Sequence, residues 1–138
     1  MIVTFLIEGE PQGKGRHRTT KSGHTYTPQK TVLYENWIKT CYLSRVGEKT
    51  LTGAIKATVE AYYTIPKSKS KKVKEQMLKG IIRPQKKPDA DNVLKAVCDS
   101  LNSIAYKDDA QIVDVSISKY YADQGFVKVT LEELEVME

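Results

Sequence analysis

The residues of this sequence best suited to chemistry are aspartates gathered in its second half. Asp89 and Asp91 follow Pro88 two positions apart, and Asp108 and Asp109 form an adjacent pair farther along. Two unit charges about 4 Å apart repel by ~4 kcal/mol at an effective dielectric near 20, so converging carboxylates need a compensating cation. Hard oxygen ligands suit Mg²⁺ or Mn²⁺. The pattern therefore predicts metal-assisted chemistry, in which a bound ion activates water and neutralises a phosphate leaving group.

The helix expected after this segment would extend the acidic surface. The proline before Asp89 favours an extended chain, in which residues two apart project to the same side, so Asp89 and Asp91 are expected to present their carboxylates together. Asp91 is also the natural N-cap of a helix predicted from about residue 91 to residue 102. Lys95 and Asp99 follow Asp91 at i+4 and i+8 and therefore share its helix face. The ammonium of Lys95 is placed to stabilise negative charge in a transition state.

Asp108 and Asp109 lie just before a predicted strand, where side chains can converge on a site. Because adjacent residues of a strand point to opposite faces, only one of the two can readily join Asp89 and Asp91, and parity does not select which. Each feature has a plain explanation when taken alone: a helix cap, a surface ion pair worth less than about 1 kcal/mol, or turn residues. Their combination predicts a metal-dependent phosphodiesterase or a nucleic-acid-binding protein.

The charge of the chain is divided along its length. The 138 residues carry a net charge of +5. Residues 1–88 hold 18 Lys and Arg against 6 Asp and Glu, whereas residues 89–138 hold 4 against 11. The segments 11–21 and 67–87 are the most basic. A surface rich in Lys and Arg binds phosphate with release of counterions, which makes binding depend on salt. A polyanionic partner is therefore favoured over a surface that is charged only for solubility.

The residues expected to contact DNA come from these two segments. The first is a loop whose glycines let the backbone approach a ligand closely, and whose arginines offer bidentate phosphate contacts that lysine cannot make. The second contains a short basic helix, for which a role in solubility alone is an open alternative. The predicted DNA-binding residues are Lys14, Arg16, Arg18, Lys21, Lys69, Lys71, Lys72, Lys86 and Lys87.

Hydrophobic periodicity predicts both strands and helices. Residues 2–7 are nearly all apolar, as in a strand covered on both faces, and residues 54–65 alternate, as in a strand with one buried face. The other predicted elements are a helix of about 16 residues after Pro28, whose apolar face holds Leu33, Trp37 and Cys41 with Tyr34 and Ile38 beside it, a short basic helix capped by Ser68 or Ser70 and closed by Gly80, the helix at about 91–102, and strands at about 111–121 and 125–134.

The resulting order, β-α-β-α-α-β-β, predicts an α+β (mixed α/β) fold, a single domain over residues 1–138 with helices packed on one mixed sheet. No apolar stretch is long enough to span a bilayer, and the N-terminus lacks the basic start of a signal peptide. Cys41 and Cys98 lack metal-binding spacing and are expected to be reduced, buried thiols. The expected location is therefore a reducing cytoplasm.

Three motifs resemble the RusA family of Holliday-junction resolvases, which is found in bacteria and their lambdoid prophages. The longest, PDxDNxxKxxxDxL, begins at Pro88, and the second, DDxQI, begins at Asp108. The third, PxxKxRxR, begins at Pro11 and is similar to the basic N-terminal motif of the family, with His17 where the family has proline. The resemblance covers nearly the whole chain.

The resemblance implies a dimeric endonuclease that uses Mg²⁺, with Mn²⁺ as a substitute, and nicks four-way DNA junctions symmetrically in recombination and repair. By position in the motifs, Asp89, Asp91 and Asp109 correspond to the catalytic, metal-binding carboxylates of the family. Lys95 corresponds to its essential lysine, and Asp108 is a secondary candidate. Because a four-way junction has two-fold symmetry, a homodimer with C2 symmetry would present identical sites to opposing strands.

Two other functions compete with this interpretation. A non-catalytic basic nucleic-acid-binding protein would use the aspartates structurally and would cleave no branched substrate. A metal-dependent hydrolase of small nucleotides would turn over a mononucleotide ester and bind a junction with little salt dependence. Neither accounts as simply for both the acidic and the basic regions of the chain.

Overall fold

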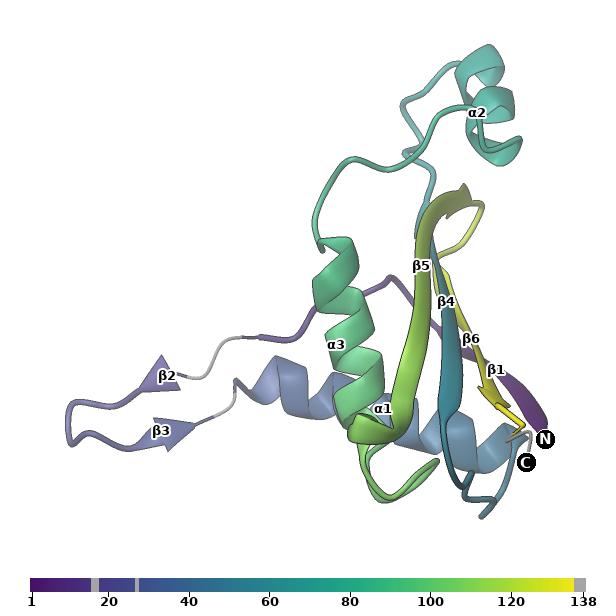
Figure 1. Ribbon diagram of the computed structural model, residues 1–138. Coiled ribbons are helices and arrows are strands. Elements are labelled where there is room, and N and C mark those ends of the chain that lie inside the picture. The colour runs from purple at the N-terminus through teal and green to yellow at the C-terminus, as the bar shows by residue number, and fades with distance from the viewer. Residues whose placement is uncertain (16–17, 27, 136–138) are drawn as a thin grey trace.

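A computed structural model describes residues 1–15, 18–26 and 28–135 of the chain. Its main sheet has four strands in the order β1-β6-β4-β5, and α1 and α3 cover one face of that sheet (Figure 1). The larger elements are β1 (Ile2–Glu8), α1 (Gln29–Arg45), β4 (Ile55–Thr64), α2 (Lys71–Leu78), α3 (Ala90–Ser100), β5 (Ile112–Ala122) and β6 (Phe126–Glu133). The predicted α+β fold class is confirmed.

Two short elements were not predicted. A two-stranded hairpin of β2 (Arg18–Thr19) and β3 (Thr25–Tyr26) extends away from the main sheet, at the left of Figure 1. A single 3₁₀ turn, η1 (Asp109–Gln111), precedes β5. Both are too short to produce a hydrophobic period, which is the signal that sequence patterns detect.

β4 is one of the two inner strands of the sheet, and its alternation matches the prediction. Ala57, Val59 and Ala61 are buried against the helices, while the residues between them are half-buried on the opposite face. β4 pairs antiparallel with β6 and parallel with β5. The turn between β5 and β6 therefore carries the chain across the end of β4, and the last two strands are not neighbours in the sheet.

The expectation that the first strand is covered on both faces is wrong. β1 is an edge strand, in which Phe5 and Ile7 are buried whereas Ile2 and Leu6 are 63% and 50% exposed. The helices cover only one face of the sheet, so an uninterrupted apolar run here does not mean burial on both sides. At the other edge of the sheet, Val115 of β5 is 51% exposed, because an edge strand has a neighbouring strand on only one side.

The buried face of α1 differs from the predicted one. Tyr34, Ile38 and Tyr42 are packed in the core, whereas Leu33 is 61% exposed and Trp37 is 41% exposed. Both sets have helical spacing and both are apolar, so periodicity could not choose between them. Instead, the indole N–H of Trp37 donates to the carbonyl oxygen of Glu8 at 2.8 Å, which ties α1 to the end of β1.

The basic helix α2 stands beyond the end of the sheet, apart from α1 and α3 (Figure 1). Ser70 is its N-cap, with its hydroxyl accepting from the backbone N–H of Val73 at 3.3 Å, and Gly80 follows with φ +77°. These positions agree with the predicted cap and stop. None of the helices in the described part of the chain combines the length and hydropathy that crossing a bilayer requires.

Candidate active site

The acidic motif surrounds a hollow between α3 and the start of β5. α3 begins at Ala90, so Asp89 rather than Asp91 is its N-cap residue, and the prediction of Asp91 as N-cap is wrong. Asp91, Lys95 and Asp99 follow one another at four-residue intervals along the helix. The hollow measures about 270 Å³ and is hereafter called the acidic hollow; its lining residues are Asp91, Leu94, Lys95, Cys98, Asp99, Asp109 and Ile112.

Asp109 reaches this hollow because the turn before β5 is fixed to the end of α3. The side-chain oxygen of Asn102 accepts from the backbone N–H of Asp109 at 2.8 Å. Tyr106 lies between Asn102 and Asp109 in the sequence and is fully buried. Its hydroxyl donates to the carbonyl oxygen of Cys98 at 2.5 Å. The loop from α3 to β5 is thereby folded back against the helix. Asp108 is exposed and does not line the hollow.

Gln111 of the DDxQI motif holds the same turn from the other side. Its side-chain oxygen accepts from the backbone N–H groups of Lys107 and Asp108 at 3.0 and 3.2 Å. Its amide group donates to the carbonyl oxygen of Gly53 at 3.0 Å, in the segment that leads into β4. The glutamine of the motif is thus a structural clamp, a role that the spacing of the motif alone did not reveal.

Asp99 is the centre of the charge network at the acidic hollow. One of its carboxylate oxygens lies 3.2 Å from Nζ of Lys95 and 3.3 Å from Nζ of Lys14. Lys14 also lies 3.1 Å from a carboxylate oxygen of Glu35 in α1. Asp99 was predicted to share a face with Lys95 but was not among the predicted catalytic residues. Its i+4 spacing from Lys95 was the available signal.

The pKa values of Asp109 and Asp99 are shifted in opposite directions. Burial, the hydrogen bond with Asp99 and the negative charges of Asp108 and Asp99 together raise the pKa of Asp109 above its usual value. For Asp99, burial alone would raise the pKa. Lys95 and Lys14 lower it, because both form hydrogen bonds with the carboxylate and both carry positive charge. Asp99 is therefore the better compensated carboxylate, and Asp109 is the one that a further cation would stabilise most.

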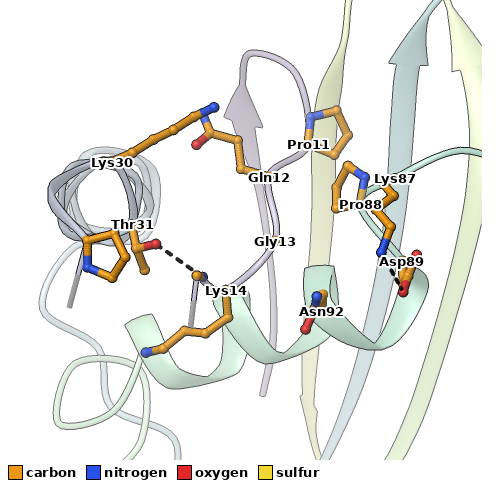
Figure 2. A pocket seen from close by; sticks show the side chains of 12 residues that line it. Pro11, Gln12, Gly13, Lys14, Lys30, Thr31, Lys87, Pro88, Asp89 and Asn92 are labelled. Carbon is orange, nitrogen blue, oxygen red and sulfur yellow. Dashed lines mark hydrogen bonds and ion pairs between the residues drawn. The ribbon is translucent and has the colours of Figure 1, made fainter. Parts of the chain in front are cut away.

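Asp89 does not line the acidic hollow. The chain is extended only up to Asp89, and Asp91 is already helical, so the expectation that these two carboxylates project together is not met. Asp89 lies at a larger hollow of about 740 Å³, 3.8 Å from Nζ of Lys87. Figure 2 shows this second hollow, with Lys30 on the side opposite to Asp89 and Lys87. The two hollows lie at α3, which supplies Asn92 to one and Asp91 to the other.

The donors of the acidic hollow suit a hard divalent cation. In the described ranges, no three His, Cys, Asp or Glu side chains lie close enough together to form a complete metal cluster. Mg²⁺ does not require one, because it is commonly held by one or two carboxylates, water molecules and substrate phosphate. Asp91 and Asp109 line the hollow together with Asp99, and the raised pKa of Asp109 reflects its burial together with the negative charge of neighbouring carboxylates, which a cation would relieve. The residues therefore fit such an ion.

The predicted DNA-binding residues whose side chains are exposed lie in three places. Lys21 is exposed on the β2–β3 hairpin, and Lys69, Lys71 and Lys72 are exposed at the start of α2. Lys86 and Lys87 are exposed between α2 and α3. Lys14, in contrast, is engaged in ion pairs, and its side chain is only 17% exposed. Arg16 lies outside the described residues, and for Arg18 only the backbone position in β2 is described.

A group of cations and aromatic rings near α2 was not predicted from the sequence. The guanidinium of Arg83 lies 4.0 Å from the ring centre of Tyr120, and Nζ of Lys119 lies 5.0 Å from that of Tyr63. Nζ of Lys119 also donates to the carbonyl oxygen of Lys86 at 2.6 Å. These contacts fix the segment before α3 to the end of the sheet. No pattern in the sequence indicated the pairing, because it joins residues more than 30 positions apart.

A basic α+β protein with carboxylates and a lysine around one hollow has the groups that metal-assisted hydrolysis of a phosphodiester requires. Comparison with known proteins agrees: the pattern of the family described as "Endodeoxyribonuclease RusA" matches residues 8–132. The chain belongs to the RusA endodeoxyribonuclease family, and the resemblance seen in its motifs is confirmed. It is also 37% identical over 137 residues to the uncharacterized protein YqaN of Bacillus subtilis (strain 168), covering 96% of each chain.

Proposed function

We propose that this protein is a Holliday-junction resolvase, which cuts four-way DNA junctions symmetrically by hydrolysing phosphodiester bonds with the help of Mg²⁺. The observation that carries the proposal is the meeting of Asp91, Lys95 and Asp109 at one hollow, in a chain of the RusA family. A role in DNA recombination and repair within the cytoplasm follows from this substrate. Mn²⁺ would replace Mg²⁺, since both are hard cations that take oxygen ligands.

In this proposal Asp91 and Asp109 hold the ion, and Asp89 contributes if the start of α3 shifts toward the acidic hollow on DNA binding. When bound, the ion lowers the pKa of a water molecule and neutralises charge on the leaving oxygen. Lys95, whose side chain is 60% exposed, stabilises the charge that develops on the reacting phosphate. Asp108 is exposed beside Asp109 and remains the secondary candidate for the ion.

The DNA would be held by exposed lysines on either side of the acidic hollow. Lys21 on the hairpin, Lys71 and Lys72 on α2, and Lys86 and Lys87 before α3 all have exposed side chains. Each lysine that neutralises a phosphate releases counterions and adds to the salt dependence of binding. Lys69 precedes α2 and is also exposed, and Arg16 and Arg18 remain predicted DNA contacts.

A homodimer would place two such sites on opposing strands of the junction. The free edge of β1 and the adjoining face of α1 support this assembly, because Ile2, Leu6, Leu33 and Trp37 are exposed there. A hollow of about 430 Å³ lies between the two elements. Sedimentation equilibrium of the wild type and of Leu6→Asp tests the assignment: a dimer that becomes a folded monomer supports it, and an unchanged mass places the interface elsewhere.

The decisive experiment is cleavage of a synthetic four-way junction with a mobile core, with each strand labelled in turn. The expected result is paired nicks at symmetric positions in opposing strands, only with Mg²⁺ or Mn²⁺ present, and no product from a linear duplex of the same sequence. Junction binding without cleavage under all metal conditions would favour the non-catalytic alternative. Turnover of a mononucleotide ester, with weak and salt-insensitive junction binding, would favour a small-nucleotide hydrolase.

A further inference from the structure

Residues 13–15, which precede the β2–β3 hairpin and are hereafter called the strap, cross between α1 and α3. The backbone N–H of Lys14 donates to the carbonyl oxygen of Asn92 in α3 at 3.3 Å. The backbone N–H of Gly15 donates to the hydroxyl of Thr31 in α1 at 3.1 Å, as the dashed line in Figure 2 shows. Gly13 packs so closely on α3 that an added Cβ would lie 3.0 Å from the Cβ of Asn92. The backbone of the strap is therefore held by both helices.

The Lys14 side chain continues this crossing as a bridge of charges. Its ammonium lies 3.1 Å from Glu35 of α1 and 3.3 Å from Asp99 of α3. Burial alone would lower the pKa of Lys14. The two carboxylates raise it, because both accept hydrogen bonds from the ammonium and both carry negative charge. Lys14 is thus a fixed cation, held by two partners with little exposure to solvent.

Lys95 shares Asp99 with Lys14 but is held far less firmly. It has this one ion-pair partner among the described residues, and its side chain is 60% exposed against 17% for Lys14. A lysine that serves a reacting phosphate must leave its resting partner. That step costs less when a second cation remains to compensate the carboxylate left behind, because an uncompensated, partly buried carboxylate is unfavourable.

We propose that Lys14 is a positioning residue, the permanent counter-ion of Asp99, and that its presence frees Lys95 to contact the phosphate of the bound DNA. This inference rests on the proposed function, in which Lys95 serves the reacting phosphate, and it replaces the predicted role of Lys14 as a direct DNA contact. Asp99 then holds Lys95 at rest and releases it during the reaction.

The test compares Lys14→Met, which removes the charge but keeps the length, with Lys14→Arg and with the double variant Lys14→Met/Asp99→Asn. Without Lys14 the ammonium of Lys95 is retained by Asp99, so single-turnover cleavage of pre-bound junction should fall about 10- to 100-fold, the usual effect of losing a supporting partner. Lys14→Arg should recover most of the rate. The double variant should also recover it, because a neutral side chain no longer retains Lys95.

Additive losses, with the double variant as slow as Lys14→Met or slower, would overturn the proposal. Junction binding without metal gives a second criterion. A direct phosphate contact would reduce the slope of log affinity against log salt by about one unit, whereas a positioning residue leaves it unchanged. Lys30→Ala, which alters an exposed lysine lining the neighbouring hollow, serves as the comparison for a positive charge that is removed without touching Asp99.

A third measurement does not depend on catalysis. The rate at which acetic anhydride modifies Lys95, followed by peptide mass spectrometry, should fall in Lys14→Met and rise again in the double variant. Equal rates in all three proteins would contradict the coupling. If the wild type cleaves no junction but Lys95 reactivity follows this order, the proposed function fails and the coupling between Lys14 and Lys95 stands.

Discussion

The side-chain oxygen of Asn102 accepts a hydrogen bond from the backbone N–H of Asp109 at 2.8 Å, and this bond joins the end of α3 to the turn that carries a candidate metal ligand. The two residues are seven positions apart. The bond restrains the backbone at Asp109, so it restrains the direction of a carboxylate that forms no ion pair with any residue that the structure describes. Loss of a residue that orients a metal ligand typically costs about 10- to 100-fold in metal affinity or activity.

Replacing Asn102 by alanine should therefore reduce cleavage about 10-fold or more while leaving junction binding intact. The matched control is Asn102→Asp, which keeps an oxygen acceptor at the same position and should lose less activity in excess Mg²⁺. The measurement is the Mg²⁺ concentration for half-maximal cleavage, which rises when Asp109 is misdirected. Equal effects of the two substitutions would mean that the bond to Asp109 has no functional weight.

Replacing Asp91 or Asp109 by asparagine should abolish nicking and keep the affinity for a four-way junction or increase it. Each change removes a negative charge near the expected path of the DNA backbone, so repulsion of phosphate decreases. Gel-shift titration in Ca²⁺ and cleavage in Mg²⁺ separate the two effects. Asp123→Asn, at an exposed turn beyond β5, is the control for loss of one negative charge. Joint loss of binding and cleavage would contradict separate roles for the acidic and basic residues.

The lysines of α2 offer a test of the DNA track. Substituting Lys71 or Lys72 by alanine should weaken junction binding and lower its salt slope by about one unit for each phosphate that the variant no longer neutralises. Both side chains are exposed at the first turn of α2, so little change in stability is expected. Lys56→Ala, on the sheet face without helices, should leave the slope unchanged. A slope that is equally unaffected in α2 would remove this helix from the DNA-binding surface.

The clamp formed by Gln111 predicts a loss of stability. Its side chain makes hydrogen bonds to the backbone of Lys107, Asp108 and Gly53. Gln111→Ala removes these hydrogen bonds, whose groups are exposed and can be rehydrated, and should lower the free energy of unfolding by about 0.5–1.5 kcal/mol. Gln111→Glu keeps the acceptor but loses the donor to Gly53. Urea unfolding should therefore place it between the wild type and the alanine variant, and an alanine variant as stable as the wild type would refute the clamp.

The lowered pKa of Asp99 predicts how stability depends on pH. Burial would raise this pKa, but the hydrogen bonds that Lys95 and Lys14 form with the carboxylate, and their positive charges, outweigh burial. The folded state therefore binds the proton of Asp99 less readily than the unfolded state does. The resulting stabilisation is present above the unfolded value of about 3.9 and is lost as the pH falls through the lower folded value.

The comparison of wild type with Asp99→Asn isolates this contribution. The difference in unfolding free energy, on the order of 1 kcal/mol for a partly exposed pair, should be constant from about pH 5 to pH 7 and should shrink below about pH 4. Thermal or urea unfolding at each pH provides the measurement. A difference that grows toward acid would have the wrong sign for a carboxylate with a lowered pKa.

Local patterns in the sequence were sufficient for much of the fold. The alternation of β4 between Ile55 and Thr64, the Ser70 cap of α2 and the stop at Gly80 were all predictable, because each depends on neighbouring residues and backbone chemistry. The same holds for the acidic motif, whose order of residues identified the family. Motif spacing also placed Lys95 and Asp99 on one face of a helix, as the structure has them.

Tertiary structure decided which of these groups meet. It brought Asp109 to the acidic hollow, which Asp91 also lines. It left Asp89 at the second, larger hollow, because α3 begins one residue earlier than predicted and the carboxylates of Asp89 and Asp91 do not project together. It engaged Lys14 with Glu35 and Asp99, although the sequence offered Lys14 only as one basic residue among many. Periodicity reports which side of an element is apolar, whereas ion pairs and edge strands depend on how distant segments close together in space.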